Sequence, residues 1–147
     1  MTILEFQNAV ADALRANEWI KRHGVPVVCE DALDVEEAAA RALAESGGIC
    51  CVVMTPAIDS LGRNCHGEEV VSVSELALSV GETAANRQES GRVTALDAAA
   101  AAAVAVTRAW PRTVTFSNIR QTQEGGMLVA TAHLATSFTL TLTPTEE

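Results

Sequence analysis

The four cysteines of this sequence have the widest chemical repertoire of its residues, and their spacing limits what they can do. They are Cys29, Cys50, Cys51 and Cys65. No two of them form a CxxC pair, and adjacent side chains in a strand point to opposite faces. Cys65-His66 is a Cys–His neighbour pair, but a zinc site would need two further ligands from distant segments. We therefore predict structural thiols, with a disulfide or a metal site as the alternatives.

The histidines and nucleophiles show no catalytic arrangement. His23, His66 and His133 are far apart in sequence, and none lies near a nucleophile motif. Adjacent residues such as Cys65 and His66 seldom have the orientation that proton transfer requires. The sequence has no GxGxxG, Walker A, HExxH or GxSxG motif. We therefore predict a protein that is not an enzyme and uses no cofactor or metal. His133 is interpreted as an ordinary surface residue.

Length and charge exclude several classes of protein. A chain of 147 residues, 48% of them apolar, is expected to form one domain over residues 1–147. The net charge of −9 argues against nucleic-acid binding, which requires basic side chains that displace counterions from phosphates. No apolar run approaches the ~18 residues of a membrane helix. The N-terminus lacks the basic segment of a secretory signal, so we expect a protein that is not secreted.

The first half of the sequence mixes helical and strand patterns. Thr2 and Glu5 form a capping box that predicts a helix start. Pro26 cannot donate to a sheet ladder, which predicts an edge strand around it. The polar loop that follows the first long strand could bind a ligand, although a hairpin connection is the simpler interpretation. The expected elements are a helix over 3–16, an edge strand over 25–29, a thinly apolar helix over 35–45, a buried strand over 49–58 and a loop over 59–67.

Residues 68–82 predict a long strand whose apolar pattern changes parity midway. The apolar residues are Val71 and Val73 in the first half and Leu76, Leu78 and Val80 in the second. A strict period of two would turn one of these sets to solvent. We therefore predict a β-bulge near Ser74-Glu75, which restores a single buried face. The polar residues 83–92 that follow predict a flexible loop.

An alanine-rich helix is predicted over residues 94–109, where Trp110-Pro111 ends it. It has almost no charge before Arg108. A helix that is apolar all round is usually buried on more than one side, which predicts contacts beyond its own sheet. The expected core stripe consists of Leu96, Ala99, Ala103, Val106 and Trp110.

The last segment predicts a hairpin with a strand over 113–123 and a second strand over 127–142. The second strand alternates apolar and polar residues for sixteen positions. At ~3.3 Å per residue it would reach ~53 Å, far beyond a usual strand. Its polar face is rich in Thr and poor in Lys, so its edge is weakly protected from pairing with another chain. The predicted subunit-interface residues are Ala99, Ala103, Val106, Thr131, Thr139 and Thr141.

These elements predict an α+β fold with a mainly antiparallel sheet, a long C-terminal hairpin and two to three packed helices. Their order over nearly the whole chain resembles the tail-terminator and tail-completion proteins of tailed bacteriophages, the family of minor tail protein U. The resemblance lies in the 3–16 helix, the 68–82 strand with its loop and 94–109 helix, and the 113–142 hairpin. The Cys65-His66 loop and the Pro26 strand have no counterpart in it.

The resemblance implies a structural role. Proteins of that family form hexameric rings on the end of the tail tube, stop its polymerisation and provide the joint to the head. The implied partners are further copies of the chain and the tail-tube and head-connector proteins. The implied location is the virion tail, or the host cytoplasm during assembly. The alternative is a small-molecule-binding or sensor domain of ferredoxin-like type, with a pocket between helix and sheet.

Overall fold

The computed structural model describes residues 1–31, 34–87 and 91–142. The helices are α1 (Ile3–Ala16), α2 (Glu18–Arg22), α3 (Val35–Ser46), α4 (Ala84–Arg87) and α5 (Ala95–Ala109). The strands are β1 (Val27–Cys29), β2 (Ile49–Val53), β3 (Ala57–Arg63), β4 (Glu69–Glu82), β5 (Thr115–Glu124) and β6 (Met127–Thr139). The predicted α+β class is confirmed.

The strands form one mainly antiparallel sheet. Their order is β1-β2-β4-β6-β5, and β3 also pairs with β4. The β1–β2 pair is parallel, whereas the other neighbouring strands are antiparallel. β2 and β3 share one side of β4, because β2 pairs with residues 78–82 of β4 and β3 pairs with residues 69–75. β1 and β3 therefore lie on one edge of the sheet, and β5 lies on the other.

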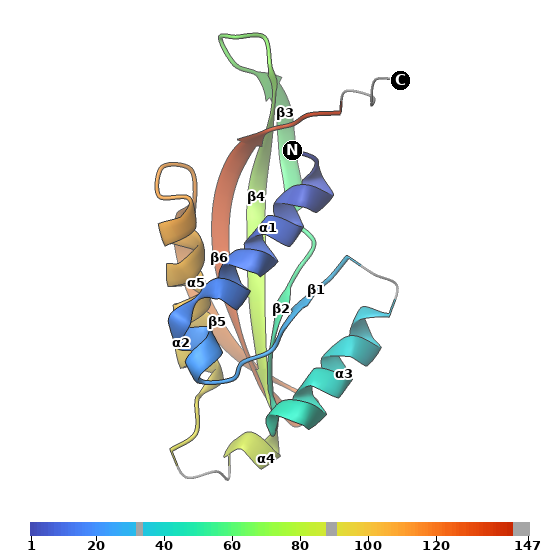
Figure 1. Ribbon diagram of the computed structural model, residues 1–147, viewed down its shortest axis with the longest axis vertical. Coiled ribbons are helices and arrows are strands. Elements are labelled where there is room, and N and C mark those ends of the chain that lie inside the picture. Colours follow the sequence, from blue (N-terminus) through green and yellow to red (C-terminus); the bar gives the residue numbers. More distant parts are fainter. Residues whose placement is uncertain (32–33, 88–90, 143–147) are drawn as a thin grey trace.

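The main core lies between the sheet and the helices α1, α2 and α5, which cover one of its faces (Figure 1). Alternate residues of the long strands point into this core, including Val71, Leu78 and Leu134. The Phe6 ring of α1 stacks on the Phe138 ring of β6, with 4.6 Å between their centroids. The Thr2–Glu5 capping box that starts α1 is present as predicted. The small alanine side chains of α5 allow this helix to pack closely on β4 and β6.

The helix α3 packs on β1 and β2 away from this core. Its Leu43 lines a hollow with Cys50 and Val52, whereas Cys51 belongs to the main core. The two adjacent cysteines therefore point to opposite faces, as predicted for a strand. Only Ala42 of α3 is fully buried, which agrees with the thin apolar face expected from the sequence.

The predicted bulge in β4 is confirmed. The register between β4 and β6 shifts between Val73 and Leu76. Because the bulge adds a residue, both halves of β4 bury their apolar side chains on the same face.

Several predicted boundaries are wrong. The strand expected over 49–58 is two strands, because it is interrupted at residues 54–56, where Pro56 lacks a backbone donor. Most of the loop expected over 59–67 belongs to β3. Residues 18–22 form a separate helix, since the Asn17 side chain caps it by accepting from the Ile20 N–H at 3.0 Å.

The C-terminal half differs less from its prediction. The loop expected over 83–92 contains the short helix α4, and residues 88–90 lie outside the described part of the chain. β6 ends at Thr139, three residues before the predicted end at 142. It is still 13 residues long, against the usual five or six. The predicted hairpin turn at Gly125-Gly126 is present.

Candidate subunit interface

The outer side of α5 carries an exposed apolar stripe. Leu96, Ala100 and Val104 follow one another at intervals of four residues, and Arg108 continues the row. The exposed fractions of Leu96 and Val104 are 44% and 42%. Leu96 was predicted to lie in the core stripe, and this is wrong. Ala99, Ala103 and Val106 of the predicted stripe are buried, as expected.

A groove of about 300 Å³ lies between this stripe and β5. We call it the α5–β5 groove, and its walls are almost entirely apolar. Phe116 is the largest side chain in it and is 46% exposed. The register of β5 against β6 shifts between Phe116 and Asn118, so Phe116 and Ile119 both lie on the helix-covered side. The groove is lined by Ala100, Ala103, Val104, Thr107, Phe116 and Ile119.

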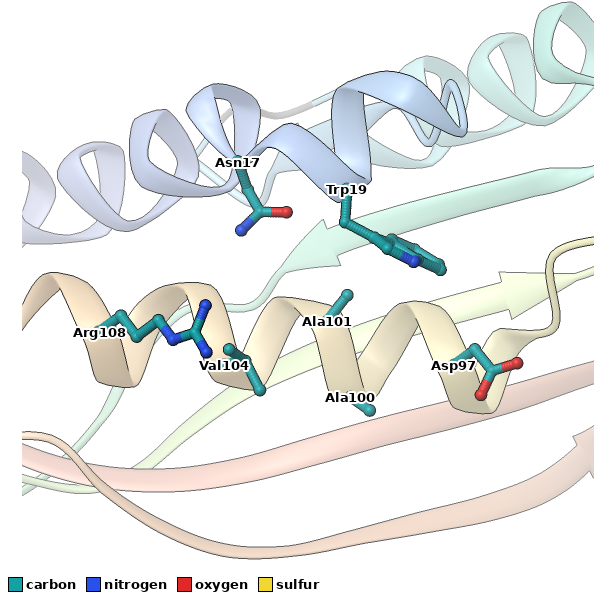
Figure 2. A pocket seen from close by; sticks show the side chains of 7 residues that line it. All are labelled: Asn17, Trp19, Asp97, Ala100, Ala101, Val104 and Arg108. Atoms are coloured by element: carbon teal, nitrogen blue, oxygen red, sulfur yellow. The ribbon is translucent and has the colours of Figure 1, made fainter.

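A second hollow, of about 430 Å³, lies on the other flank of the same stripe (Figure 2). Trp19 of α2 extends toward α5, and Asp97 and Arg108 lie near the two ends of the hollow. Ala100 and Val104 line both this hollow and the α5–β5 groove. The two hollows therefore adjoin along Ala100 and Val104, between α2 on one flank of α5 and β5 on the other.

The groove borders the free edge of β5. β5 is the last strand of the sheet and pairs with β6 alone among the described strands. The N–H and C=O groups on its outer side are thus open to another strand. Over ten residues it carries only Arg120 and Glu124 as charged side chains. An edge with few charges beside an apolar groove is suited to pairing with another chain.

Some of the predicted interface residues are buried within the subunit and others are exposed. Ala99 and Val106 have exposed fractions of 0%, so they are enclosed within the subunit and cannot contact a partner. Ala103 is mostly buried but lines the α5–β5 groove. Thr139 and Thr141 are exposed at and beyond the end of β6. Their contact with a partner stays a prediction.

Thr131 lies on the face of the sheet opposite α5. It is half-buried, and its hydroxyl oxygen is 3.3 Å from that of Ser79. The surface residues that the sequence reasoning missed are Ala100, Val104 and Phe116. The spacing of Leu96, Ala100 and Val104 carried this signal, since residues four apart share one helix face.

A polar hollow of about 370 Å³ lies on the same opposite face. His133 Nδ1 is 3.1 Å from Glu75 Oε2 in it, a surface contact that the sequence did not predict. Asn118 Oδ1 is buried and has no hydrogen-bond partner within the described residues. The bulges of β4 and β5 both lie at this level of the sheet. The remaining lining residues are Ser74, Ser117 and Arg120.

The cysteines lie in two environments. Cys65 is exposed, and Cys29, Cys50 and Cys51 are buried free thiols. Burial raises the pKa of Cys50 to about 11 and that of Cys51 to about 12. Burial, with a smaller contribution from the Asp31 carboxylate, raises the pKa of Cys29 to about 11. Within the described ranges, no three His, Cys, Asp or Glu side chains gather where they could hold a metal ion.

Fold and surface together define an α+β sheet domain with an exposed apolar groove beside a free strand edge. In the part of the chain that the structure describes, no helix has the length and apolar character to span a membrane. The sequence matches no protein-family model and no curated protein.

Proposed function

We propose that this protein is a structural subunit that assembles with its own copies into a ring. The ring belongs to a tailed-phage virion, where it ends the tail tube and joins it to the head. This is the role of the tail-terminator proteins that the order of elements resembles. The protein acts by binding other virion proteins and carries out no reaction.

The observation that carries the proposal is the α5–β5 groove beside the unpaired edge of β5. An exposed Phe and Val next to open backbone groups form a surface that is unfavourable in water and favourable in a protein contact. Monomeric proteins protect such edges with Lys, Pro or short strands. β5 has ten residues and contains neither Lys nor Pro.

Charge also supports a protein partner. The net charge is −9, which disfavours binding to DNA and RNA. Arg108 in the last turn of α5 and Arg112 between α5 and β5 make no ion pair within the described residues. They are therefore available for acidic groups on another protein surface.

A substitution in the groove tests the self-association. Phe116→Asp places a charge in the apolar contact and is expected to reduce the assembly to 15.4 kDa monomers. The control is Gln121→Asp, which adds the same charge to β5 outside the groove. Light scattering after size exclusion measures both masses. An unchanged mass for Phe116→Asp would contradict a role of the groove in assembly.

The genes beside this one test the phage role. Neighbours that encode a capsid, portal or tail-tube protein are expected if the ring belongs to a virion. Neighbours that encode a metabolic pathway would contradict the virion role. The self-association tested above would then need another explanation.

The polar hollow around His133 favours the alternative of a small-molecule-binding domain. Its donors and acceptors from β4, β5 and β6 could orient a polar ligand. A thermal-shift screen tests this possibility. A ligand-induced rise in the melting temperature that His133→Ala and Arg120→Ala abolish would favour it. We prefer the ring because the apolar groove and the free edge are unexplained by a small-ligand site.

A further inference from the structure

Among the residues that the structure describes, the sheet has a second unpaired edge, on the side away from β5. β3 and residues 64–73 form a hairpin that we call the arm, and Figure 1 shows its tip beyond the N-terminus of α1. All seven residues of β3 are exposed, and the main contacts of β3 are with β4. The exposed fraction of Leu61 is 65% and that of Ile58 is 38%. The arm therefore presents a free strand edge with uncovered apolar side chains.

These side chains point to the same side of the sheet as α5. Leu61 is opposite Val71 and Ile58 is opposite Val73, and both valines belong to the main core. Directly paired residues of neighbouring strands share a face. If the sheet were extended at β5 by a β3 strand, Leu61 and Ile58 would lie beside Phe116, in the α5–β5 groove.

We infer that the arm of one copy packs on the β5 edge of the next copy and places Leu61 in its α5–β5 groove. This inference rests on the proposed ring and names the surface that occupies its groove. The contact is heterologous, because two different surfaces of the chain meet and each copy uses both. Contacts of this type close into rings when the rotation between copies allows it.

The strand directions agree with this contact. β3 runs antiparallel to β4, β4 to β6, and β6 to β5, so β3 and β5 run in opposite directions. When two copies lie side by side in the same orientation, β3 of one is antiparallel to β5 of the other. Such a pair can form a regular hydrogen-bonded ladder.

The positions of β3 and β5 along the strand direction agree with a closed ring. β3 is level with residues 69–75 of β4, whereas Phe116 and Ile119 pair through β6 with residues near 76–78. To place the arm beside Phe116 of the next copy, that copy must be shifted by about five residues along the strands, or roughly 17 Å. Across the strands, one copy contributes β3, β4, β6 and β5, which are four strand spacings or about 19 Å wide. This ratio corresponds to a strand tilt of about 40°, within the ~35–45° of closed β-barrels.

The charges of the two surfaces are complementary. The acidic residues of the arm are Asp59, Glu68 and Glu69. Its one arginine or lysine is Arg63, which already pairs with Glu69 at 2.8 Å. Arg108 lies in the last turn of α5 and Arg112 between α5 and β5, the two elements that bound the groove. The arm thus carries mainly acidic side chains and the segment from the end of α5 to β5 carries arginines, and complementary charge orients such contacts.

Two variants, each with one surface altered, test the inference with the full chain. Leu61→Asp alters the arm and leaves the groove intact, and Phe116→Asp alters the groove and leaves the arm intact. Both residues are exposed, and circular dichroism checks that each variant is folded. Ser60→Asp is the matched control, because Ser60 lies on the opposite face of β3, across from Ser72. The masses of the single proteins and of their mixture are measured by light scattering.

We expect the wild type and Ser60→Asp to assemble and each of the two variants to be monomeric alone. Their mixture is expected to give a dimer of one copy each, because one intact arm meets one intact groove. Assembly of Leu61→Asp alone, or a mixture that stays monomeric, would overturn the arm–groove contact and leave the ring possible. A monomeric wild type would overturn both the ring and this contact.

Discussion

Among single residues, Glu82 has the most demanding environment. It is fully buried, and its Oε1 accepts the Ala95 N–H at 3.0 Å, where α5 begins. Asn86 Nδ2 donates to Oε2 at 2.8 Å, and Arg92 Nε lies 2.8 Å from the same oxygen. Glu82 thus ties the end of β4 to the start of α5, and it fixes the helix whose outer side forms the groove.

Replacing Glu82 is expected to destabilise the fold. Glu82→Ala leaves Arg92 and the Ala95 N–H without their partner, and we expect a loss of ~3–5 kcal/mol in the free energy of unfolding. The control is Glu69→Ala, which breaks the exposed pair with Arg63 and is expected to cost less than ~1 kcal/mol. Urea denaturation measures both. Equal effects of the two substitutions would contradict the structural role of Glu82.

The buried cysteines predict a selective thiol reactivity. At pH 8 only Cys65 is expected to react rapidly with a thiol reagent, since Cys29, Cys50 and Cys51 are buried and their pKa values are raised. Mass spectrometry after labelling is expected to show one modification on the native protein and four after unfolding. Rapid native labelling at Cys51 would contradict its place in the core.

The same pKa values predict a loss of stability at high pH. Native Cys50 and Cys51 keep their protons up to about pH 11 and 12. Unfolded thiols ionise near pH ~8.5, so above this pH the unfolded state binds fewer protons than the native state. The free energy of unfolding should therefore fall as the pH rises from about 9 to 12. Urea midpoints at pH 8 and pH 10.5 test this, and the fall should be smaller in Cys51→Ala.

Among the elements, α5 has two different sides. Its inner side is built of alanine and packs on the sheet, and its outer stripe is exposed. Ala100→Glu is expected to leave the fold intact and to prevent assembly, because Ala100 is exposed and lines the groove. Ala103→Glu is expected to disrupt the fold as well, because only 6% of Ala103 is exposed. Circular dichroism and light scattering separate the two outcomes, and a folded, assembled Ala103→Glu would contradict this burial.

Much of this arrangement could be predicted from the sequence. The capping box of α1 and the bulge in β4 depend on local spacing, and the sequence contains that spacing. The buried side of α5 was predicted for Ala99, Ala103 and Val106, but the exposure of Leu96 was missed because alanines surround most of the helix and the spacing of Leu96, Ala100 and Val104 was not recognised as a separate stripe. The strand β3 was missed because all its residues are exposed, so no apolar alternation marks it.

The surface contacts were even less predictable. The pairing of His133 with Glu75 joins residues 58 positions apart, and a bulge orients the glutamate. The α5–β5 groove requires Phe116 to lie on the helix side, which depends on a register shift in β5. Both features depend on tertiary register, which local spacing does not determine.

At the scale of the whole molecule, the described part of the sheet has two unpaired edges. The β5 edge and the arm lie on opposite sides of the sheet, so one copy can bind a neighbour on each side. An assembly built this way either closes into a ring or grows without limit. The proposed tail-terminator role requires closure, because a terminator ends a polymer.

Native mass spectrometry of the wild-type protein tests closure most directly. The account predicts one dominant species whose mass is a fixed multiple of 15.4 kDa and does not change with protein concentration. The multiple is six if the resemblance to tail-terminator proteins extends to their rings. A 15.4 kDa monomer at every concentration, or a ladder of species that lengthens with concentration, would contradict a closed ring.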